Sequence, residues 1–130
     1  MPYIPKVLVV DDDLNILAAF EDFLRRERCA MLSATSPADA LKILRDHRVD
    51  LLVTDVRLEL QSGITFLLRV KESLPKIPVI VITGYPDLVT EQDARAYGAD
   101  YFFLKPLEID KLRDAVRKCL SVNNNERLYV

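Results

Sequence analysis

Polar side chains that can carry chemistry stand directly after the apolar runs of this chain. Asp11, Asp12 and Asp13 follow the run Val7–Val10, and a fourth carboxylate, Asp55, follows the residues LLVT. A short apolar run of this kind is typical of a buried strand in a parallel sheet. We therefore expect each group of carboxylates at the carboxyl end of a strand, although an aspartate there is also a common turn residue or helix N-cap.

Two further apolar runs end in polar residues of other types. Thr83 ends the run VIVIT, and Lys105 follows YFFL. Taken singly, a threonine at a strand end is usually a cap, and a lysine before proline is usually a solvated terminus. Aspartates, a threonine and a lysine at four of five strand ends are unlikely to be a coincidence of caps, so their conjunction indicates a site.

The expected set of side chains suits phosphoryl transfer. Several carboxylates in one crevice repel each other unless they share a cation. An incomplete set of oxygen ligands with room for water favours Mg²⁺ over Ca²⁺. Lys105 adds a fixed positive charge and Thr83 a hydroxyl, and both could hold the oxygens of a phosphoryl group. A carboxylate nucleophile, a divalent ion, a lysine and a hydroxyl are what this reaction requires, because its catalysis is mostly positioning and charge neutralisation.

The elements that would position these side chains alternate along the chain. Each apolar run is followed by a segment with helical spacing, and such alternation predicts parallel strands joined by right-handed crossovers with helices on both faces. The predicted class is a doubly wound α/β sandwich, in which sites form beyond the carboxyl ends of the strands. The predicted strands are Lys6–Val10, Cys29–Ala34, Asp50–Thr54, Val79–Ile82 and Tyr101–Leu104.

Composition narrows the class of protein. The chain has 130 residues, 50% of them hydrophobic, which fits one compact domain. A net charge of -2 without a basic stripe argues against direct nucleic-acid binding. Cys29 and Cys119 lack metal-ligand or redox-motif spacing, and the sequence has neither a signal-peptide pattern nor an apolar run of membrane-spanning length. We expect a cytoplasmic location with reduced thiols.

From about Lys6 to Leu120 the chain resembles the receiver domains of two-component response regulators. The motifs that carry the resemblance are VLVVDD at 7–12, LLVTD at 51–55 followed by Gly63, VIVITG at 79–84 and GADYFFLKP at 98–106. The resemblance implies a flavodoxin-like sheet with strand order 2-1-3-4-5. It implies a receiver domain over residues 1–121, and the polar composition of residues 122–130 predicts a flexible tail or the start of a linker.

The resemblance also implies roles for the aspartates. Asp55 would be the phosphoacceptor, taking a phosphoryl group from the phosphohistidine of a histidine kinase or a histidine phosphotransfer protein. Asp12 would bind Mg²⁺ directly and Asp11 through water, with Asp55 and the backbone carbonyl of Arg57 completing the protein ligands. Asp13 is then left as an N-terminal residue of the first helix. Such a domain is not a conventional enzyme, although it catalyses its own phosphorylation and its slow dephosphorylation.

Thr83 and Lys105 would hold the phosphoryl oxygens, and the peptide bond before Pro106 is expected to be cis. Phosphorylation would draw the Thr83 hydroxyl inward and let the switch aromatic, Phe102, rotate. The readout surface would be the fourth helix, fifth strand and fifth helix, where an output domain or a homodimer could form. The kinase should dock near Asp55, on the start of the first helix at Leu14 and Asn15 and on the loop after Pro106.

The chain departs from the family pattern at three positions. Glu59 stands where a proline is usual after the phosphoacceptor, and Arg28 stands where a glycine is frequent, with little consequence expected. The switch aromatic is Phe102 and not a tyrosine. Arg57 and Tyr85 are expected to flank the path of attacking water, and their size, with no acid or amide to orient that water, predicts slow dephosphorylation.

Two other classes of protein remain possible from the residues. A haloacid-dehalogenase-like phosphatase also uses an aspartate nucleophile with Mg²⁺ and needs a second aspartate two residues later as general acid. Asp11 and Asp13 have that spacing, but Asn15 and the short chain fit poorly, and after Asp55 the corresponding residue is Arg57, which cannot donate a proton. The other class is a pseudo-receiver that binds partners without phosphorylation.

Overall fold

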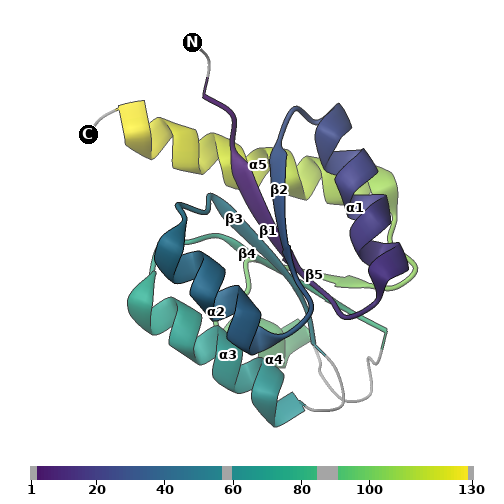
Figure 1. The fold of residues 1–130 in the computed structure, drawn as a ribbon, viewed down its shortest axis with the longest axis vertical. Helices are drawn as coiled ribbons and strands as arrows, with labels where there is room; N and C mark the ends of the chain where they lie inside the picture. The colour runs from purple at the N-terminus through teal and green to yellow at the C-terminus, as the bar shows by residue number, and fades with distance from the viewer. Residues whose placement is uncertain (1–2, 57–59, 85–90, 129–130) are drawn as a thin grey trace.

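The computed structural model describes residues 3–56, 60–84 and 91–128. Five strands and five helices alternate along these residues, as the sequence predicts (Figure 1). The strands are β1 (Lys6–Val10), β2 (Ala30–Ala34), β3 (Leu51–Asp55), β4 (Val79–Thr83) and β5 (Tyr101–Leu104). The helices are α1 (Leu14–Arg26), α2 (Pro37–Asp46), α3 (Leu60–Ser73), α4 (Glu91–Ala96) and α5 (Ile109–Leu128).

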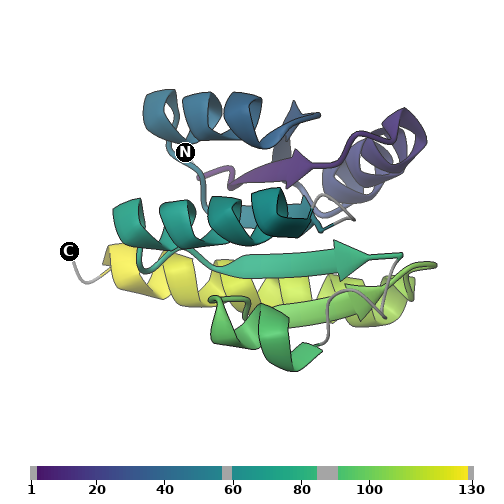
Figure 2. The ribbon, with the colours of Figure 1, turned by 90° about the horizontal axis from the view of Figure 1, so that it is seen from below.

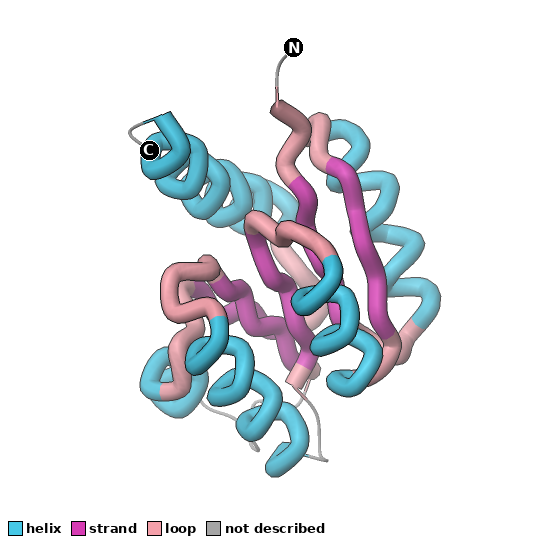
Figure 3. The backbone as a smooth tube through the Cα atoms, turned by 60° about the vertical axis from the view of Figure 1, so that its left-hand side comes forward, coloured by secondary structure: helices cyan, strands magenta, loops and turns pink. Residues whose placement is uncertain are grey.

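All five strands form one parallel sheet in the order β2-β1-β3-β4-β5. Figure 3 shows the strands side by side with helices on both faces of the sheet. The predicted doubly wound class and the strand order implied by the resemblance are therefore confirmed. The central position of β1 and β3 buries both faces of these strands, which explains why their sequences are continuous apolar runs.

The helices cover the sheet in two layers that have separate cores. Side chains alternate between the faces of a strand, so Val7 and Val9 pack in the cluster that includes α1 and α5, whereas Leu8 and Val10 pack in the cluster that includes α3 and α4. Figures 1 and 2 show α2, α3 and α4 as neighbouring helices of one layer. Both layers leave the carboxyl ends of the strands at one edge of the molecule.

The first two helices begin at the side-chain caps that the sequence predicts. Asp13 is the N-cap of α1, and its carboxylate accepts a hydrogen bond from the Asn15 amide at 2.9 Å. Ser36 is the N-cap of α2 and accepts from the Asp39 amide, with Pro37 in the first turn. Each cap satisfies a backbone donor that has no partner within the helix.

Two helix boundaries differ from what the sequence predicts. The sequence places Ser62 and Gly63 before the third helix, but α3 begins at Leu60 and includes both residues. The helical spacing of apolar residues ends at Leu120 and predicts the end of the last helix there, but α5 continues to Leu128. A formed helix gains a hydrogen bond for each added residue, and no Gly or Pro interrupts residues 121–128, so the polar composition there does not stop it. Whether residues 122–130 form a linker stays a prediction.

No helix among the described residues is both long and apolar enough to cross a bilayer. Even α5, which spans 20 residues, carries charged and amide side chains along its length. The observation agrees with the absence of a long apolar run in the sequence.

Helices α1 and α4 end in the same backbone motif with different residues at its left-handed position. After α4, Gly98 has a φ of 109°, and its amide and that of Ala99 bond back to helix carbonyls. After α1, Arg28 has a φ of 59°, with the corresponding bonds from its own amide and that of Cys29. This is the Schellman arrangement, which favours glycine because a Cβ is strained there. Contrary to expectation, Arg28 therefore carries a conformational cost.

Replacing Arg28 by glycine should stabilise the domain by about 0.5–1 kcal/mol, because relief of left-handed strain outweighs the extra freedom of the unfolded chain. The free energy of unfolding in urea measures this. Arg28→Ala is the matched control, since it removes the same side chain and keeps the strained Cβ. Equal stability of the glycine and alanine variants would contradict the explanation.

Candidate functional site

The register of the parallel strands brings the predicted site residues to one edge of the sheet. Val10 lies opposite Thr54, so the residues that follow them, Asp11 and Asp55, are neighbours at the ends of β1 and β3. Asp55 is in turn opposite Ile82, the residue before Thr83. On the next pair of strands, Thr83 is opposite Leu104, which directly precedes Lys105. Residues separated by up to 94 positions in the chain thus meet because of strand register.

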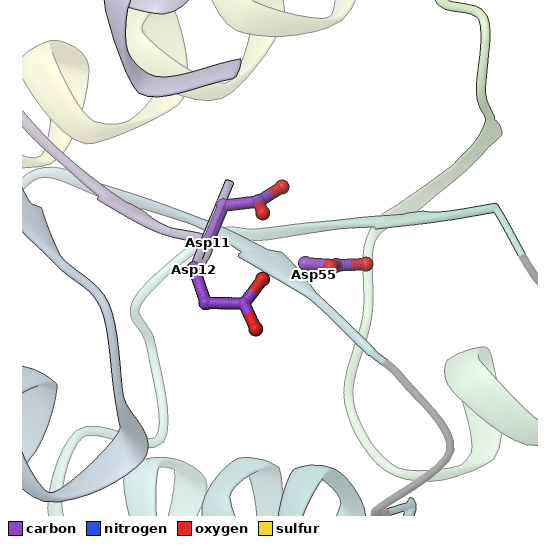
Figure 4. Close-up of side chains that lie close together, drawn as sticks. All are labelled: Asp11, Asp12 and Asp55. Carbon is purple, nitrogen blue, oxygen red and sulfur yellow. The ribbon is translucent and has the colours of Figure 1, made fainter. Parts of the chain in front are cut away.

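Three carboxylates form the centre of the site. One oxygen from each of Asp11, Asp12 and Asp55 lies within 4.8 Å of the others, and Figure 4 shows the three side chains together where β1 and β3 end. The side chain of Asp11 is fully buried and that of Asp55 is 5% exposed, whereas Asp12 is on the surface. A partly open set of oxygen donors with no nitrogen or sulfur fits a hard divalent cation such as Mg²⁺.

Lys105 compensates the charge of the two buried carboxylates. Its Nζ donates to Asp11 Oδ2 at 2.9 Å and lies 3.4 Å from Asp55 Oδ2. Burial opposes the charge on the lysine, but the hydrogen bond to Asp11 and the charges of both aspartates outweigh it, so the pKa of Lys105 is raised. The peptide bond from Lys105 to Pro106 is cis, as expected. Lys105 therefore contacts Asp11 more closely than the predicted phosphoacceptor.

The three consecutive aspartates Asp11, Asp12 and Asp13 have different contacts and exposure. The Asp11 Oδ1 accepts a hydrogen bond from the Asp13 amide at 2.9 Å, which fixes its carboxylate between that amide and Lys105. Asp13 turns its own side chain to the start of α1 as the N-cap. Asp12, between them, is the exposed member of the carboxylate cluster. The expectation that Asp13 serves the helix is thus confirmed.

Thr83 ends β4 beside Asp55 on β3, and Phe102 lies on the neighbouring strand β5, opposite Val81. Thr83 is fully buried, and its hydroxyl donates a hydrogen bond to the carbonyl of Val56 at 2.9 Å. Phe102 is partly buried and packs against the core that includes α3 and α4. The hydroxyl of a threonine has one proton to donate, so it must leave Val56 before it can donate to any other oxygen.

Several sequence predictions concern residues outside the described part of the chain. They are the carbonyl of Arg57, the acid at Glu59, Tyr85, and the beginning of the predicted fourth helix near Asp87. Helix α4 as described starts at Glu91. The roles assigned to these residues stay predictions.

Two carboxylates at the opposite end of the sheet, the buried Asp50 and the exposed Asp100, were not singled out in the sequence. Asp50 accepts hydrogen bonds from the Tyr3 hydroxyl and the Lys6 amide, and Asp100 accepts one from the Val79 amide. Each aspartate binds the amide at the start of a neighbouring strand. Their role is structural, and the available signal was an aspartate placed directly before an apolar run.

Comparison with known proteins shows the family of this chain. The family model described as the response regulator receiver domain matches residues 7–117. The chain therefore belongs to the receiver domains of two-component response regulators.

Similar proteins include both short and long relatives. Sporulation initiation phosphotransferase F of Bacillus subtilis is 34% identical over 120 residues, which cover 92% of this chain and 97% of that protein. The transcriptional regulatory protein ZraR of Escherichia coli is 34% identical over 115 residues, covering 88% of this chain and 26% of ZraR. The chain thus spans about a quarter of ZraR.

Solved structures show the same fold. The signal receiver domain of an HD domain-containing protein from Pseudomonas fluorescens has a TM-score of 0.87 at 27% identity, over 100% of this chain and 96% of that one. The beryllofluoride-activated NtrC4 receiver domain, solved as a dimer, has a TM-score of 0.82 at 28% identity, over 91% and 98% of the two chains.

The pairing of Lys105 predicts a large effect of its removal. Lys105→Met should lower the free energy of unfolding by about 3 kcal/mol without divalent ions, because the buried Asp11 loses its counter-ion. Because the pKa of Lys105 is raised in the folded state, its contribution is fully present below its unfolded pKa and lost as pH rises through the folded value. Unfolding in urea at neutral pH and above pH about 11 measures both effects.

Adding Asp11→Asn to the Lys105→Met variant is the control, since it removes the charge that was left unpaired. The double variant should recover part of the lost stability. If the two substitutions were simply additive, the pairing would not be the cause.

Proposed function

We propose that Asp55 is the phosphoacceptor of this receiver domain and that its donor is the phosphohistidine of a histidine kinase or a histidine phosphotransfer protein. The observation that carries the proposal is the convergence of Asp11, Asp12 and Asp55 within 4.8 Å, with Lys105 beside two of them. Asp55 is the member that ends the central strand β3. Its side chain is 5% exposed, which leaves an oxygen within reach of a donor and little room for competing water.

In the transfer step, one carboxylate oxygen of Asp55 attacks the phosphorus of the donor. A P–O bond forms as the P–N bond breaks, and the imidazole nitrogen keeps the electron pair of that bond. The product is an acyl phosphate on Asp55 and a free histidine on the donor. Lys105 is positioned to hold one phosphoryl oxygen, because its Nζ already lies 3.4 Å from the Asp55 carboxylate.

Asp11, Asp12 and Asp55, together with the backbone carbonyl of Arg57, would hold Mg²⁺. The three carboxylates fit this ion in donor type and in their mutual distances. When bound, Mg²⁺ would neutralise the negative charge that accumulates between the aspartates and the phosphoryl oxygens. Without a divalent ion, the charge of Lys105 partly offsets the two carboxylates.

Switching would start at the hydroxyl of Thr83. In the described state it donates to the Val56 carbonyl, and a phosphoryl oxygen on Asp55 would compete for its single proton with the stronger attraction of a charged acceptor. Movement of Thr83 would open space beside Phe102 on the neighbouring strand. The affected surface is formed by α4, β5 and α5, where the large side chains Tyr97, Leu104 and Ile109 are exposed.

Two exposed apolar surfaces support the proposed partners, one at the start of α1 for the phosphodonor and one on α4-β5-α5 for readout. Leu14, at the start of α1, is 70% exposed beside the carboxylates, which suits docking of the phosphodonor together with Asn15. The α4-β5-α5 surface is available to an output domain or a second copy of the chain. A cytoplasmic receiver over residues 1–121, with residues 122–130 leading into a linker, is part of this proposal.

Treatment with acetyl phosphate and Mg²⁺ should add a single phosphoryl group, seen by mass spectrometry of the intact chain. Asp55→Asn should abolish it, and EDTA should prevent it. Asp50→Asn is a matched control, because it alters a buried carboxylate at the other end of the sheet and should leave labelling intact. No labelling of wild type would favour a phosphorylation-independent pseudo-receiver, and steady turnover of phosphomonoesters would favour a phosphatase.

Replacing Leu14 by glutamate should slow phosphoryl transfer from the cognate histidine kinase by about tenfold, because an apolar docking contact is lost at the interface centre. Labelling by acetyl phosphate should stay unchanged, since it needs no docking. Leu68→Glu is the control, because Leu68 is also exposed but lies on α3. Equal slowing by both variants would argue against docking at α1.

The size of Arg57 and Tyr85 predicts slow loss of phosphate from Asp55. The double variant Arg57→Asn, Tyr85→Ala should release phosphate about tenfold faster, because water gains access and an amide can orient it. Phosphate release after labelling and removal of acetyl phosphate measures the rate. A wild-type rate equal to or above that of the variant would refute this explanation.

A further inference from the structure

A second cleft lies at the end of the sheet opposite the carboxylates. It has a volume of about 490 Å³ and is formed where β4 and β5 begin, between the ends of α3 and α4 and the middle of α5. The length of β4, Val79–Thr83, separates it from the carboxylate site by roughly 13 Å. The cleft is lined by Lys71, Pro75, Lys76, Ile77, Pro78, Arg95, Asp100, Tyr101, Lys118 and Cys119.

We propose that this cleft binds a nucleoside phosphate, a ligand with a flat aromatic base and several negative charges. The proposal is independent of phosphorylation at Asp55, because the two sites share no residue. A volume of this size is within the range of about 300–1,000 Å³ that is usual for small-molecule sites.

The first argument is charge. Four of the lining side chains are cations that come from different segments, Lys71 on α3, Lys76 after it, Arg95 on α4 and Lys118 on α5. The one lining acid, Asp100, uses its carboxylate to accept the Val79 amide. Four cations against one acid, on a chain with a net charge of -2, form a local positive field that favours an anion.

The second argument is that part of this charge is held in place without neutralisation. The Lys71 Nζ donates to the Ile77 carbonyl at 2.6 Å, and its stem lies over Gly98, where an added Cβ would come within 2.8 Å of it. The Arg95 Nη1 donates to the Asp100 carbonyl at 2.9 Å. Backbone carbonyls orient these cations but leave their charge, and Lys71 and Lys76 have no carboxylate partner among the residues described.

Arg95 and Lys118, unlike Lys71 and Lys76, are paired with acids, but these pairs lie at the surface. Arg95 contacts Glu91, and Lys118 contacts Asp114 at 3.0 Å, with both members of each pair about half exposed or more. Exposed pairs of this kind contribute little free energy. A phosphate chain in the cleft could therefore draw both cations to itself at small cost.

The third argument is the apolar lining. Pro75, Ile77, Pro78 and Cys119 give the cleft apolar walls, and Tyr101, whose ring stacks on Phe103, is the aromatic residue of the lining. Stacking on an aromatic ring contributes about 1–3 kcal/mol per base where proteins bind single-stranded nucleic acids. Cations from several segments beside an aromatic ring fit a base joined to phosphates better than either part alone.

Titration of the ¹⁵N-labelled full chain with ATP in EDTA, followed by heteronuclear NMR, tests the proposal. Saturable shifts are expected for amides of residues 71–78, 100–101 and 118–119. Adenosine and tripolyphosphate should each bind at least about tenfold more weakly, because each retains only one of the two contacts. Shifts confined to the carboxylate edge, or none at all, would overturn the proposal.

Variants separate this cleft from general attraction to positive charge. Lys76→Gln with Lys118→Gln should weaken ATP binding by about tenfold, since two charge-assisted contacts are lost. Lys42→Gln with Lys111→Gln removes the same charge from exposed lysines outside the cleft; Lys111 lies on α5, as Lys118 does, and is likewise paired with an acid, Glu108. This control should change affinity by less than about twofold, and all four substitutions are at exposed positions where folding should persist.

Tyr101→Leu tests the base separately and should remove the preference for ATP over tripolyphosphate. Equal affinity for the two ligands in wild type would reduce the cleft to a simple anion site and refute the proposal. Binding of a glutamate-rich peptide without binding of ATP would also refute it, in favour of an acidic protein partner.

Discussion

The site depends on one electrostatic constraint, the gathering of carboxylates at the end of two central strands. Asp11 and Asp55 are almost fully removed from water, and a charged pair in such a place is stable only beside a cation. Lys105 supplies that cation from the end of the edge strand β5, which is separated from β1 by β3 and β4 in the sheet. Lys105 offsets the charge of both aspartates and leaves one oxygen of each within 4.8 Å of an oxygen of the exposed Asp12, an arrangement that fits a hard cation.

The parallel sheet places the lysine and the carboxylates close together. Adjacent strands are in register at their carboxyl ends, so single residues at the ends of β1, β3, β4 and β5 become neighbours. The two helical layers bury the strands on both faces and hold that register firmly. At this edge the hydroxyl of Thr83 donates to the Val56 carbonyl, and the proposed switch would exchange that acceptor for a phosphoryl oxygen.

The two ends of the sheet have opposite chemistry. At the carboxyl ends of the strands, three acids lie close together beside one lysine, whereas at the amino ends several cations line a cleft. The aspartates at the amino ends, Asp50 and Asp100, accept hydrogen bonds from backbone amides. The proposed phosphoacceptor site and the proposed nucleotide cleft therefore lie at opposite ends of the sheet. Helices α4 and α5 border the basic cleft and also belong to the surface proposed for readout, so a ligand in the cleft would contact two elements of that surface.

The sequence alone determined the class of fold and most of the site, because both depend on local patterns. Apolar runs followed by Asp11, Asp55, Thr83 and Lys105 placed these residues at strand ends, and helix caps such as Asp13 are set by neighbouring residues. Only the tertiary structure decided that Lys105 pairs with Asp11, that Thr83 donates to Val56, and that Arg28 adopts a left-handed conformation. It also decided the basic cleft, because its cations come from separate segments whose meeting depends on packing and not on any local pattern.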